Sequence, residues 1–153
     1  MTKELVLGCD SAALVLMKEI REFLDAKKIP YHFVGVADSS DETYYSIVAK
    51  KVAEEIINSG YQKEGLLICG TGIGMSITAN KFPGIYAAVC HDNYSAERAR
   101  LSNDTNVICM GARIIGPELA KKVLQEWLDL EFKGGRSQPK VDVIKEIEKQ
   151  VYK

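Results

Sequence analysis

Gly65-Leu-Leu-Ile-Cys69-Gly-Thr-Gly-Ile-Gly-Met-Ser76 joins an uncharged apolar run directly to a turn that carries glycine at alternate positions. Such a run is typical of a strand buried on both faces of a parallel sheet. Alternate glycines let the backbone turn tightly, and the residues from Ile73 to about Lys81 follow a helical pattern. The stretch therefore predicts a strand that passes into a helix within a few residues.

The same alternation of apolar runs and helical patterns extends in both directions along the chain. The expected strands are residues 5–9, 31–36, 65–69, 85–90 and 106–110. The expected helices are residues 12–26, one opened by Asp41 that carries Val48, Val52 and Ile56 on one face, and residues 73–81, 93–101 and 117–130. Strict alternation implies right-handed crossovers, so we predict a three-layer α/β/α Rossmann-like domain with a parallel five-stranded sheet.

The chain changes character after Leu130. Residues 131–153 contain a basic break with Gly134-Gly135-Arg136, and Pro139 then starts a last amphipathic helix whose stripe is Val141, Ile144, Ile147 and Val151. This helix has no following strand, so it either covers its own core or packs on a second subunit. We expect the second arrangement, with one domain over residues 1–153, a core at 1–130 and an interface helix at 131–153.

Composition excludes several classes of function. Lys and Arg number 20 and Asp and Glu number 21, so the net charge of −1 offers no basic surface for nucleic acid. No signal peptide or membrane span is expected, which indicates a cytoplasmic protein. The cysteines do not pair at C-x-x-C spacing, and His32 and His91 belong to no Cys-His cluster, so neither a metal site nor a disulfide framework is expected.

The glycine turn after Cys69 has the features of a reactive site. Its N–H groups form an anion-binding nest beside a helix start, and in that field the thiolate of Cys69 is favoured. With the Thr71 hydroxyl, the loop predicts a base beside an oxyanion hole. It matches neither a dinucleotide fingerprint nor a P-loop. The alternative is a plain strand–turn–helix corner whose glycines serve packing only; for Cys9, Cys90 and Cys109 we expect core packing.

Motifs in a fixed order along nearly the whole chain resemble one known family. They are Cys69-Gly-Thr-Gly-Ile-Gly-Met-Ser76, Ala79-Asn-Lys81, Cys90-His-Asp92, Tyr94-Ser-Ala96, Asn103-Asp-Thr-Asn-Val107, Gly111-Ala-Arg113 and Gly134-Gly-Arg136. This pattern is similar to the ribose-5-phosphate isomerase B family, which includes the galactose-6-phosphate isomerase subunits. The resemblance implies an α/β/α fold, a phosphosugar substrate, homodimers or homotetramers, active sites built across a subunit boundary, and no metal or organic cofactor.

The resemblance also implies roles for individual residues. Cys69 is the expected base that removes the proton next to the sugar carbonyl, and Thr71 helps to stabilise the enediolate. The expected substrate-binding positions are Asp10, Ser11, Tyr45, Gly70, Gly72, Gly74, Ser102 and Asn103. The expected phosphate-binding positions are Arg113, Arg136 and Lys140.

The sequence leaves the family pattern at a few of these positions. Ser11, Ser102 and Ser137 stand where the family has histidine, and Lys140 stands where it has arginine. Serine does not act unaided as an acid–base group near neutral pH, whereas histidine does. His91 or water could replace the lost group, a partner subunit could supply it, or the substrate could differ from ribose 5-phosphate and react in its open-chain form. We therefore predict an aldose–ketose isomerase of phosphorylated sugars. The alternative is a non-catalytic phosphosugar-binding or partner subunit.

Overall fold

The structure is a computed structural model that describes residues 2–152 of the 153-residue chain. Met1 and Lys153, the ends of the expected domain, lie outside the described residues. The strands are β1 (Leu5–Cys9), β2 (Tyr31–Phe33), β3 (Glu64–Cys69), β4 (Ala87–Val89) and β5 (Val107–Gly111). The helices are η1 (Ser11–Ala13), α1 (Leu14–Ala26), α2 (Tyr45–Asn58), α3 (Ile73–Ala79), α4 (Asn93–Leu101), α5 (Pro117–Asp129), η2 (Gly135–Ser137) and α6 (Gln138–Val151).

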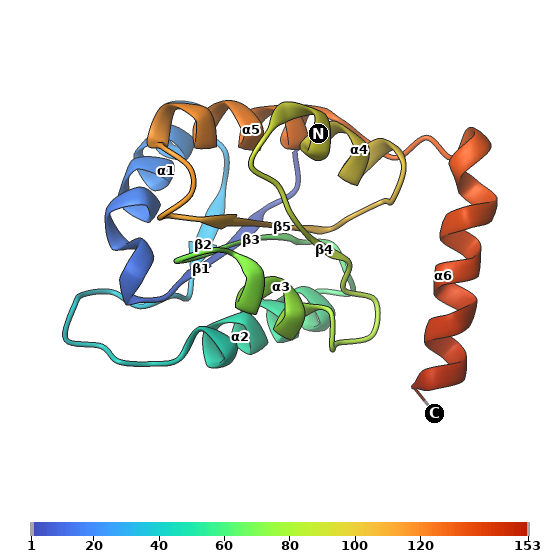
Figure 1. Cartoon of the computed structure of the whole chain (residues 1–153), viewed down its shortest axis with the longest axis horizontal. Coiled ribbons are helices and arrows are strands. Elements are labelled where there is room, and N and C mark those ends of the chain that lie inside the picture. The colour runs from blue at the N-terminus through green and yellow to red at the C-terminus, as the bar shows by residue number, and fades with distance from the viewer. Residues whose placement is uncertain (1, 153) are drawn as a thin grey trace.

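The five strands form one sheet in the order β2-β1-β3-β5-β4, and every neighbouring pair is parallel. Helices α1, α4 and α5 cover one face and α2 and α3 cover the other, so the predicted three-layer fold is confirmed (Figure 1). The chain leaves β1 toward β2 and returns to place β3 on the other side of β1. The chain therefore leaves β1 and β3 toward opposite sides of the sheet. Open parallel sheets usually bind ligands at the carboxyl ends of two strands related in this way, here β1 and β3.

Each face of the sheet has its own apolar core, because alternate residues of a strand point to opposite faces. Leu5 and Leu7 pack toward α1 and α5, whereas Val6 packs toward α2. Trp127 of α5 is fully buried and lies against the Arg100 guanidinium, whose carbon is 3.5 Å from the ring centroid. The expected core packing of the three remaining cysteines is confirmed, since Cys9, Cys90 and Cys109 are at most 1% exposed.

The second helix does not begin where the sequence predicted. Asp41 does not open it; its carboxylate instead accepts hydrogen bonds from the Thr43 N–H at 3.0 Å and from the Thr43 hydroxyl at 2.6 Å. This local turn satisfies the carboxylate and keeps the backbone extended through Tyr44, so α2 starts at Tyr45. The expected strands 31–36 and 85–90 are also shorter, as Ala87–Val89 shows for the second.

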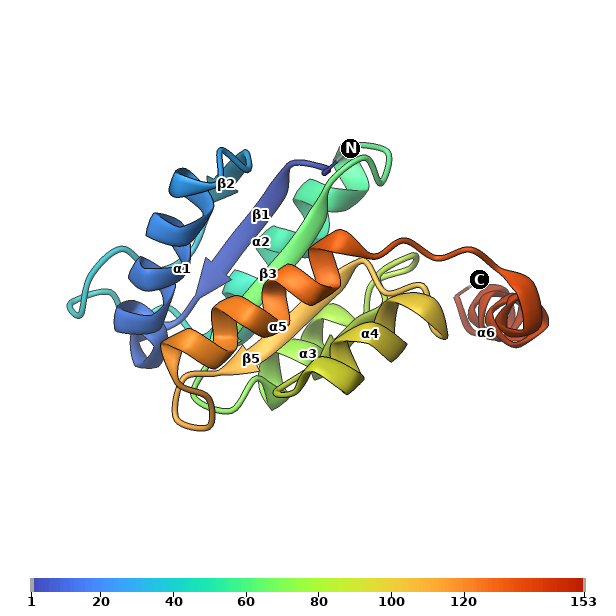
Figure 2. The same cartoon turned by 90° about the horizontal axis from the view of Figure 1, so that it is seen from above.

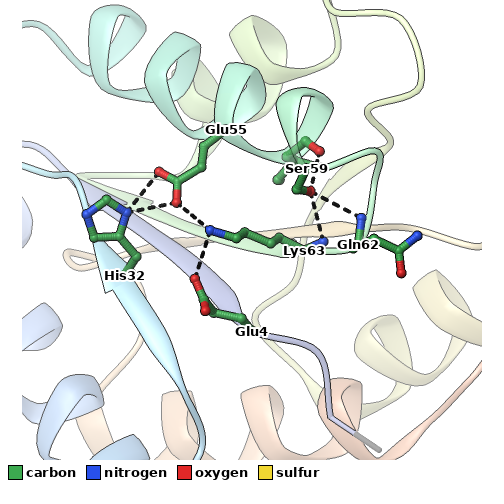
Figure 3. Close-up of polar contacts among 7 residues, drawn as sticks. Glu4, His32, Glu55, Ser59, Gln62 and Lys63 are labelled. Atoms are coloured by element: carbon green, nitrogen blue, oxygen red, sulfur yellow. Dashed lines mark hydrogen bonds and ion pairs between the residues drawn. The ribbon is translucent and has the colours of Figure 1, made fainter.

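Charged side chains tie the elements together on the surface beside β2 (Figure 3). Lys63 Nζ lies 2.9 Å from a Glu4 carboxylate oxygen and 3.0 Å from Glu55, and His32 Nδ1 lies 2.8 Å from Glu55. His32 is on a strand, and its ring is exposed. These contacts link the start of β1, β2, α2 and the approach to β3.

Helix α6 stands apart from the three layers, beyond the amino ends of the strands (Figures 1 and 2). Gly134 and Gly135 precede it with φ angles of 76° and 59°, in the left-handed region that favours glycine. Val141 is its buried residue, whereas Ile144, Ile147 and Val151 are 41%, 52% and 68% exposed. Among residues 2–152, no helix combines the length and the apolar character needed to cross a membrane.

Candidate active site

Cys69 ends β3 at the carboxyl edge of the sheet, and its side chain is only 5% exposed. The Gly72 N–H points back at the sulfur and lies 3.1 Å from Sγ. This N–H is available because Gly72 adopts a φ of 79°, which turns the backbone back toward the strand end. Hydrogen-bond donors aimed at a sulfur atom favour its anionic form in general.

The loop is held from behind by the backbone that follows β5. The Ala112 N–H donates to the Cys69 carbonyl at 2.8 Å, and the Arg113 N–H donates to the Gly70 carbonyl at 3.0 Å. The Arg113 guanidinium also lies over Gly70, with Nη1 3.4 Å from the place a Cβ would occupy there. The structure therefore brings a cation, a thiol and a glycine turn to one place.

Tyr45, at the start of α2, lies against the same loop. A Cβ at Gly74 would come within 2.1 Å of Cε1 of the Tyr45 ring, so only glycine fits beneath this side chain. Thr71 lies at the turn, where its Oγ1 accepts a hydrogen bond from the Ile73 N–H at 3.3 Å. Tyr45 is 42% exposed, which leaves part of the ring free to meet a ligand.

Asp10 and Ser11 lie one strand away from Cys69, because β1 pairs with β3 and Cys9 is opposite Ile68. The Asp10 carboxylate caps η1 by accepting a hydrogen bond from the Ala12 N–H at 3.0 Å. Ser11 is exposed. Both predicted positions therefore lie at the carboxyl ends of the strands, one strand away from Cys69.

His91 is a residue whose place the sequence did not define. Its Nε2 accepts a hydrogen bond from the Gly111 N–H at 2.8 Å, and Gly111 is the register partner of Cys69. Burial lowers the pKa of His91, which outweighs the opposing effect of Asp92 and favours the neutral ring that this bond requires. His91 thus fixes the strand beside Cys69, and with Nε2 occupied it is poorly placed to replace a lost acid. The Cys90-His91-Asp92 motif was the only sequence signal for it.

The remaining predicted residues do not meet Cys69 within one chain. Ser102 and Asn103 follow α4 and precede β5, so they lie at the amino edge of the sheet, opposite the Cys69 edge. The Ser102 hydroxyl accepts a hydrogen bond from Arg98 Nη1 at 3.1 Å, and Asn103 is exposed. Arg136 and Lys140 are exposed on η2 and α6. Within residues 2–152, no group of three or more His, Cys, Asp or Glu side chains is arranged to hold a metal ion.

Comparisons with known proteins agree with this architecture. Residues 5–144 match the family model described as Ribose/Galactose Isomerase. The chain is 48% identical to ribose-5-P isomerase B of Listeria innocua over 96% of this chain and 98% of that one. It is also 48% identical to D-erythrulose-4-phosphate isomerase of Pectobacterium atrosepticum, over 92% and 91% of the two chains. The solved structure of Clostridium thermocellum ribose-5-phosphate isomerase B superposes with a TM-score of 0.91 at 38% identity, over 97% and 99% of the chains.

The fold and these matches define an enzyme that isomerises phosphorylated sugars between aldose and ketose forms. The chain belongs to the ribose/galactose isomerase family. The family, the fold and the enzyme class predicted from the sequence are thereby confirmed.

Proposed function

We propose that Cys69 is the base of the isomerisation. Its thiolate removes the proton from the carbon next to the sugar carbonyl, and the resulting enediolate is reprotonated at the neighbouring carbon while a proton moves between the two oxygens. The observation that carries this proposal is the Gly72 N–H, which lies 3.1 Å from the buried Cys69 sulfur. The Thr71 hydroxyl and the amides of Gly70 and Gly74 then face the developing oxyanion, a role worth ~3 kcal/mol for a well-placed donor.

We further propose that Asp10, Ser11 and Tyr45 bind the sugar hydroxyls and that Arg113 contributes to phosphate binding. Asp10 and Ser11 follow the strand next to the one that Cys69 ends, and the Arg113 guanidinium lies over Gly70. A guanidinium suits a phosphate because it donates two parallel hydrogen bonds. The reaction as written uses the substrate's own atoms and one protein base, so it needs neither a metal nor an organic cofactor.

A second copy of this chain would complete the site, in a homodimer or homotetramer. Helix α6 presents an apolar stripe of Ile144, Ile147 and Val151 to the outside, which is the face a second subunit would cover. The residues at the amino edge, Ser102 and Asn103, face away from their own Cys69. Together with Arg136 and Lys140, we assign them to the site of the neighbouring copy, where residues 131–153 serve as the interface segment.

The substrate we propose is a phosphosugar that reacts in its open-chain form, in particular a four-carbon sugar phosphate. Ser11, Ser102 and Ser137 offer no group that titrates near neutral pH to open a ring. A tetrose with its phosphate on the terminal oxygen has no hydroxyl left to close a five-membered ring, so it needs no such group. The Pectobacterium relative named for D-erythrulose 4-phosphate supports this choice. We place the enzyme in the cytoplasm, since its four cysteines are free thiols.

The test is solvent exchange at the reacting carbon. Purified protein is incubated in deuterated water with tetrose, pentose and hexose phosphates, and deuterium at carbon 2 is followed by NMR. We expect exchange with the native protein and none with Cys69→Ser. Exchange by Cys69→Ser at the native rate would remove Cys69 from the mechanism, and a preference for pentose over tetrose phosphates would contradict the proposed substrate.

A further inference from the structure

The side chain of Asn106, which lies just before β5, holds the segment between α3 and β4. Asn106 Nδ2 donates to the Gly84 carbonyl at 2.8 Å, and Asn106 Oδ1 accepts from the Tyr86 N–H at 2.8 Å. Gly84 has a φ of 78°, so its backbone is turned out of the extended form. One amide side chain thus fixes this segment to the loop that carries Ser102 and Asn103.

Glu148 of α6 binds the same segment from the other side. One carboxylate oxygen accepts from the Gly84 N–H at 3.1 Å, and the other accepts from the Tyr86 hydroxyl at 3.1 Å. Burial, together with the Glu148 charge, raises the pKa of Tyr86 to about 12, which keeps the phenol protonated as a donor. Both oxygens of Glu148 are therefore used, and hydrogen bonds to an ionised carboxylate are among the stronger ones in proteins.

These contacts form a continuous polar clamp, defined here as Glu148, Gly84, Tyr86 and Asn106. It links α6 to the loop before β5 through backbone and side-chain hydrogen bonds. One further hydrogen bond supports it, since the Tyr152 hydroxyl donates to the Lys81 carbonyl at 2.8 Å.

Apolar packing within one chain does little to hold α6 in this position. Val141 is the buried apolar side chain of the helix, and a cavity of about 660 Å³ lies beside the clamp, bordered by Tyr86, Asp104, Phe132 and Lys145. Close-packed side chains normally fix a helix through many small contacts. Within one chain the clamp replaces much of that packing, so the position of α6 relative to its own sheet depends on a few hydrogen bonds.

We propose that Glu148 and Asn106 are positioning residues for phosphate binding, an inference that rests on the proposed function. Lys140 and Arg136 lie at the start of the segment whose far part Glu148 fixes, and Asn103 lies in the loop that Asn106 fixes. The clamp sets the distance between Asn103 and the two cations, Arg136 and Lys140. These three residues bind the substrate of the neighbouring copy. A misplacement of about 1 Å in such a grip is enough to weaken binding strongly.

The experiment compares Glu148→Ala and Glu148→Gln with the native enzyme in the oligomeric state found for it. We measure kcat and KM for the sugar phosphate, the inhibition constant of inorganic phosphate, and phosphate binding by calorimetry. We expect Glu148→Ala to raise KM and the phosphate constants about tenfold with kcat nearly unchanged, because Cys69 lies at the opposite edge of the sheet. Glu148→Gln keeps an acceptor for the Gly84 N–H and should restore most of the loss.

Lys145→Ala is the matched control on the same helix, because its long, exposed ion pair with Asp104 contributes little. Unchanged KM and phosphate affinity in Glu148→Ala would overturn the proposal. If that variant does not assemble, Tyr86→Phe removes a single clamp bond, and native phosphate affinity in an assembled Tyr86→Phe enzyme would equally overturn it. Activity in Cys69→Ser would refute the proposed mechanism. The clamp would still be testable, because phosphate binding measured by calorimetry does not depend on which residue is the base.

Discussion

At the carboxyl ends of the strands Cys69 and Gly70 are held by backbone N–H groups of Ala112 and Arg113, whereas at the amino ends α6 is held by the side chains of Glu148 and Tyr152. At the carboxyl ends, one chain supplies all of these contacts itself, so the thiol is buried and the glycine turn is fixed. The second edge turns outward, with exposed Asn103 and an exposed apolar stripe on α6. Under the proposed function, each chain builds the reacting half of its own site and supplies the binding half of its neighbour's site.

The largest effect should follow from Cys69→Ser, which removes the proposed base while leaving the backbone of the carboxyl edge in place. We expect kcat to fall ~1,000-fold, within the range known for loss of general base catalysis, with the melting temperature little changed. Cys109→Ala is the control, since it removes a buried thiol outside the loop and should lose stability rather than activity. Near-native turnover in Cys69→Ser would show that the carboxyl edge is not the reacting half.

Ile147→Asp tests whether the amino edge acts through a second copy. A charge on the exposed apolar stripe of α6 should prevent its burial, so light scattering should show monomers and activity should fall ~100-fold, because half of the site is missing. The control is Glu146→Ala, an exposed neighbour on the same helix that should leave assembly and turnover intact. Truncation after Leu130 should behave like Ile147→Asp, and a truncated chain that stays dimeric would place the interface elsewhere.

Gly74→Ala probes how tightly the carboxyl edge is packed. The added Cβ would meet the Tyr45 ring at 2.1 Å, so ring and loop must separate, and we expect kcat/KM to fall ~10-fold. A double-mutant cycle with Tyr45→Ala sharpens the test: Gly74→Ala should cost less when the ring is absent. Equal cost in both backgrounds would show that Tyr45 does not constrain the loop.

Ser102→His tests the role of the amino edge in substrate choice. Restoring an acid–base group should raise kcat/KM for ribose 5-phosphate ~10-fold through assisted ring opening, and should leave a tetrose phosphate unaffected. Steady-state kinetics with both substrates measures the difference. Efficient native turnover of ribose 5-phosphate that the histidine does not improve would defeat the proposed preference for open-chain sugars.

The smallest effect concerns His91 and pH. Its pKa is lowered in the folded chain by burial, so the unfolded chain binds a proton first as the pH falls through the ordinary value of 6.5. The free energy of unfolding should therefore decrease as the pH falls through that region, and His91→Gln should reduce this dependence. Urea unfolding at several pH values measures it, with His32→Gln on the exposed surface as the comparison. An unchanged slope in His91→Gln would exclude this linkage.

Much of the fold was predictable because its signals are local. The uncharged run before Cys69 and the capping Asp92 define β3 and α4 from neighbouring residues alone, and α4 spans the predicted 93–101. The start of α2 was mispredicted because Asp41 is equally suited to cap a helix or a turn, and Thr43 decided for the turn. Local sequence patterns do not distinguish a helix cap from a turn at Asp41.

For the site, sequence motifs suggested roles but did not show which residues meet. Ser102 and Asn103 stand in the same motif series as Cys69, yet the parallel direction of β5 places them at the other end of the sheet. Glu148 had no signal at all, because its partners Gly84 and Tyr86 are 64 and 62 residues away and one of them is a backbone N–H. Nearly every residue has a backbone N–H, so no residue type in the sequence marks the partner of such a hydrogen bond.

Four residues depart from the pattern that the sequence otherwise resembles, and their position in the fold has an evolutionary consequence. Ser11, Ser102, Ser137 and Lys140 lie at exposed or half-buried places rather than in either core. Substitutions at such places usually change the free energy of unfolding by less than ~0.5 kcal/mol. Under the proposed function these residues help to select the sugar, so the lineage could exchange them without weakening the sheet or the Cys69 loop. One scaffold would then acquire new substrates by drift along its outer edge while the proton-transfer chemistry stays the same.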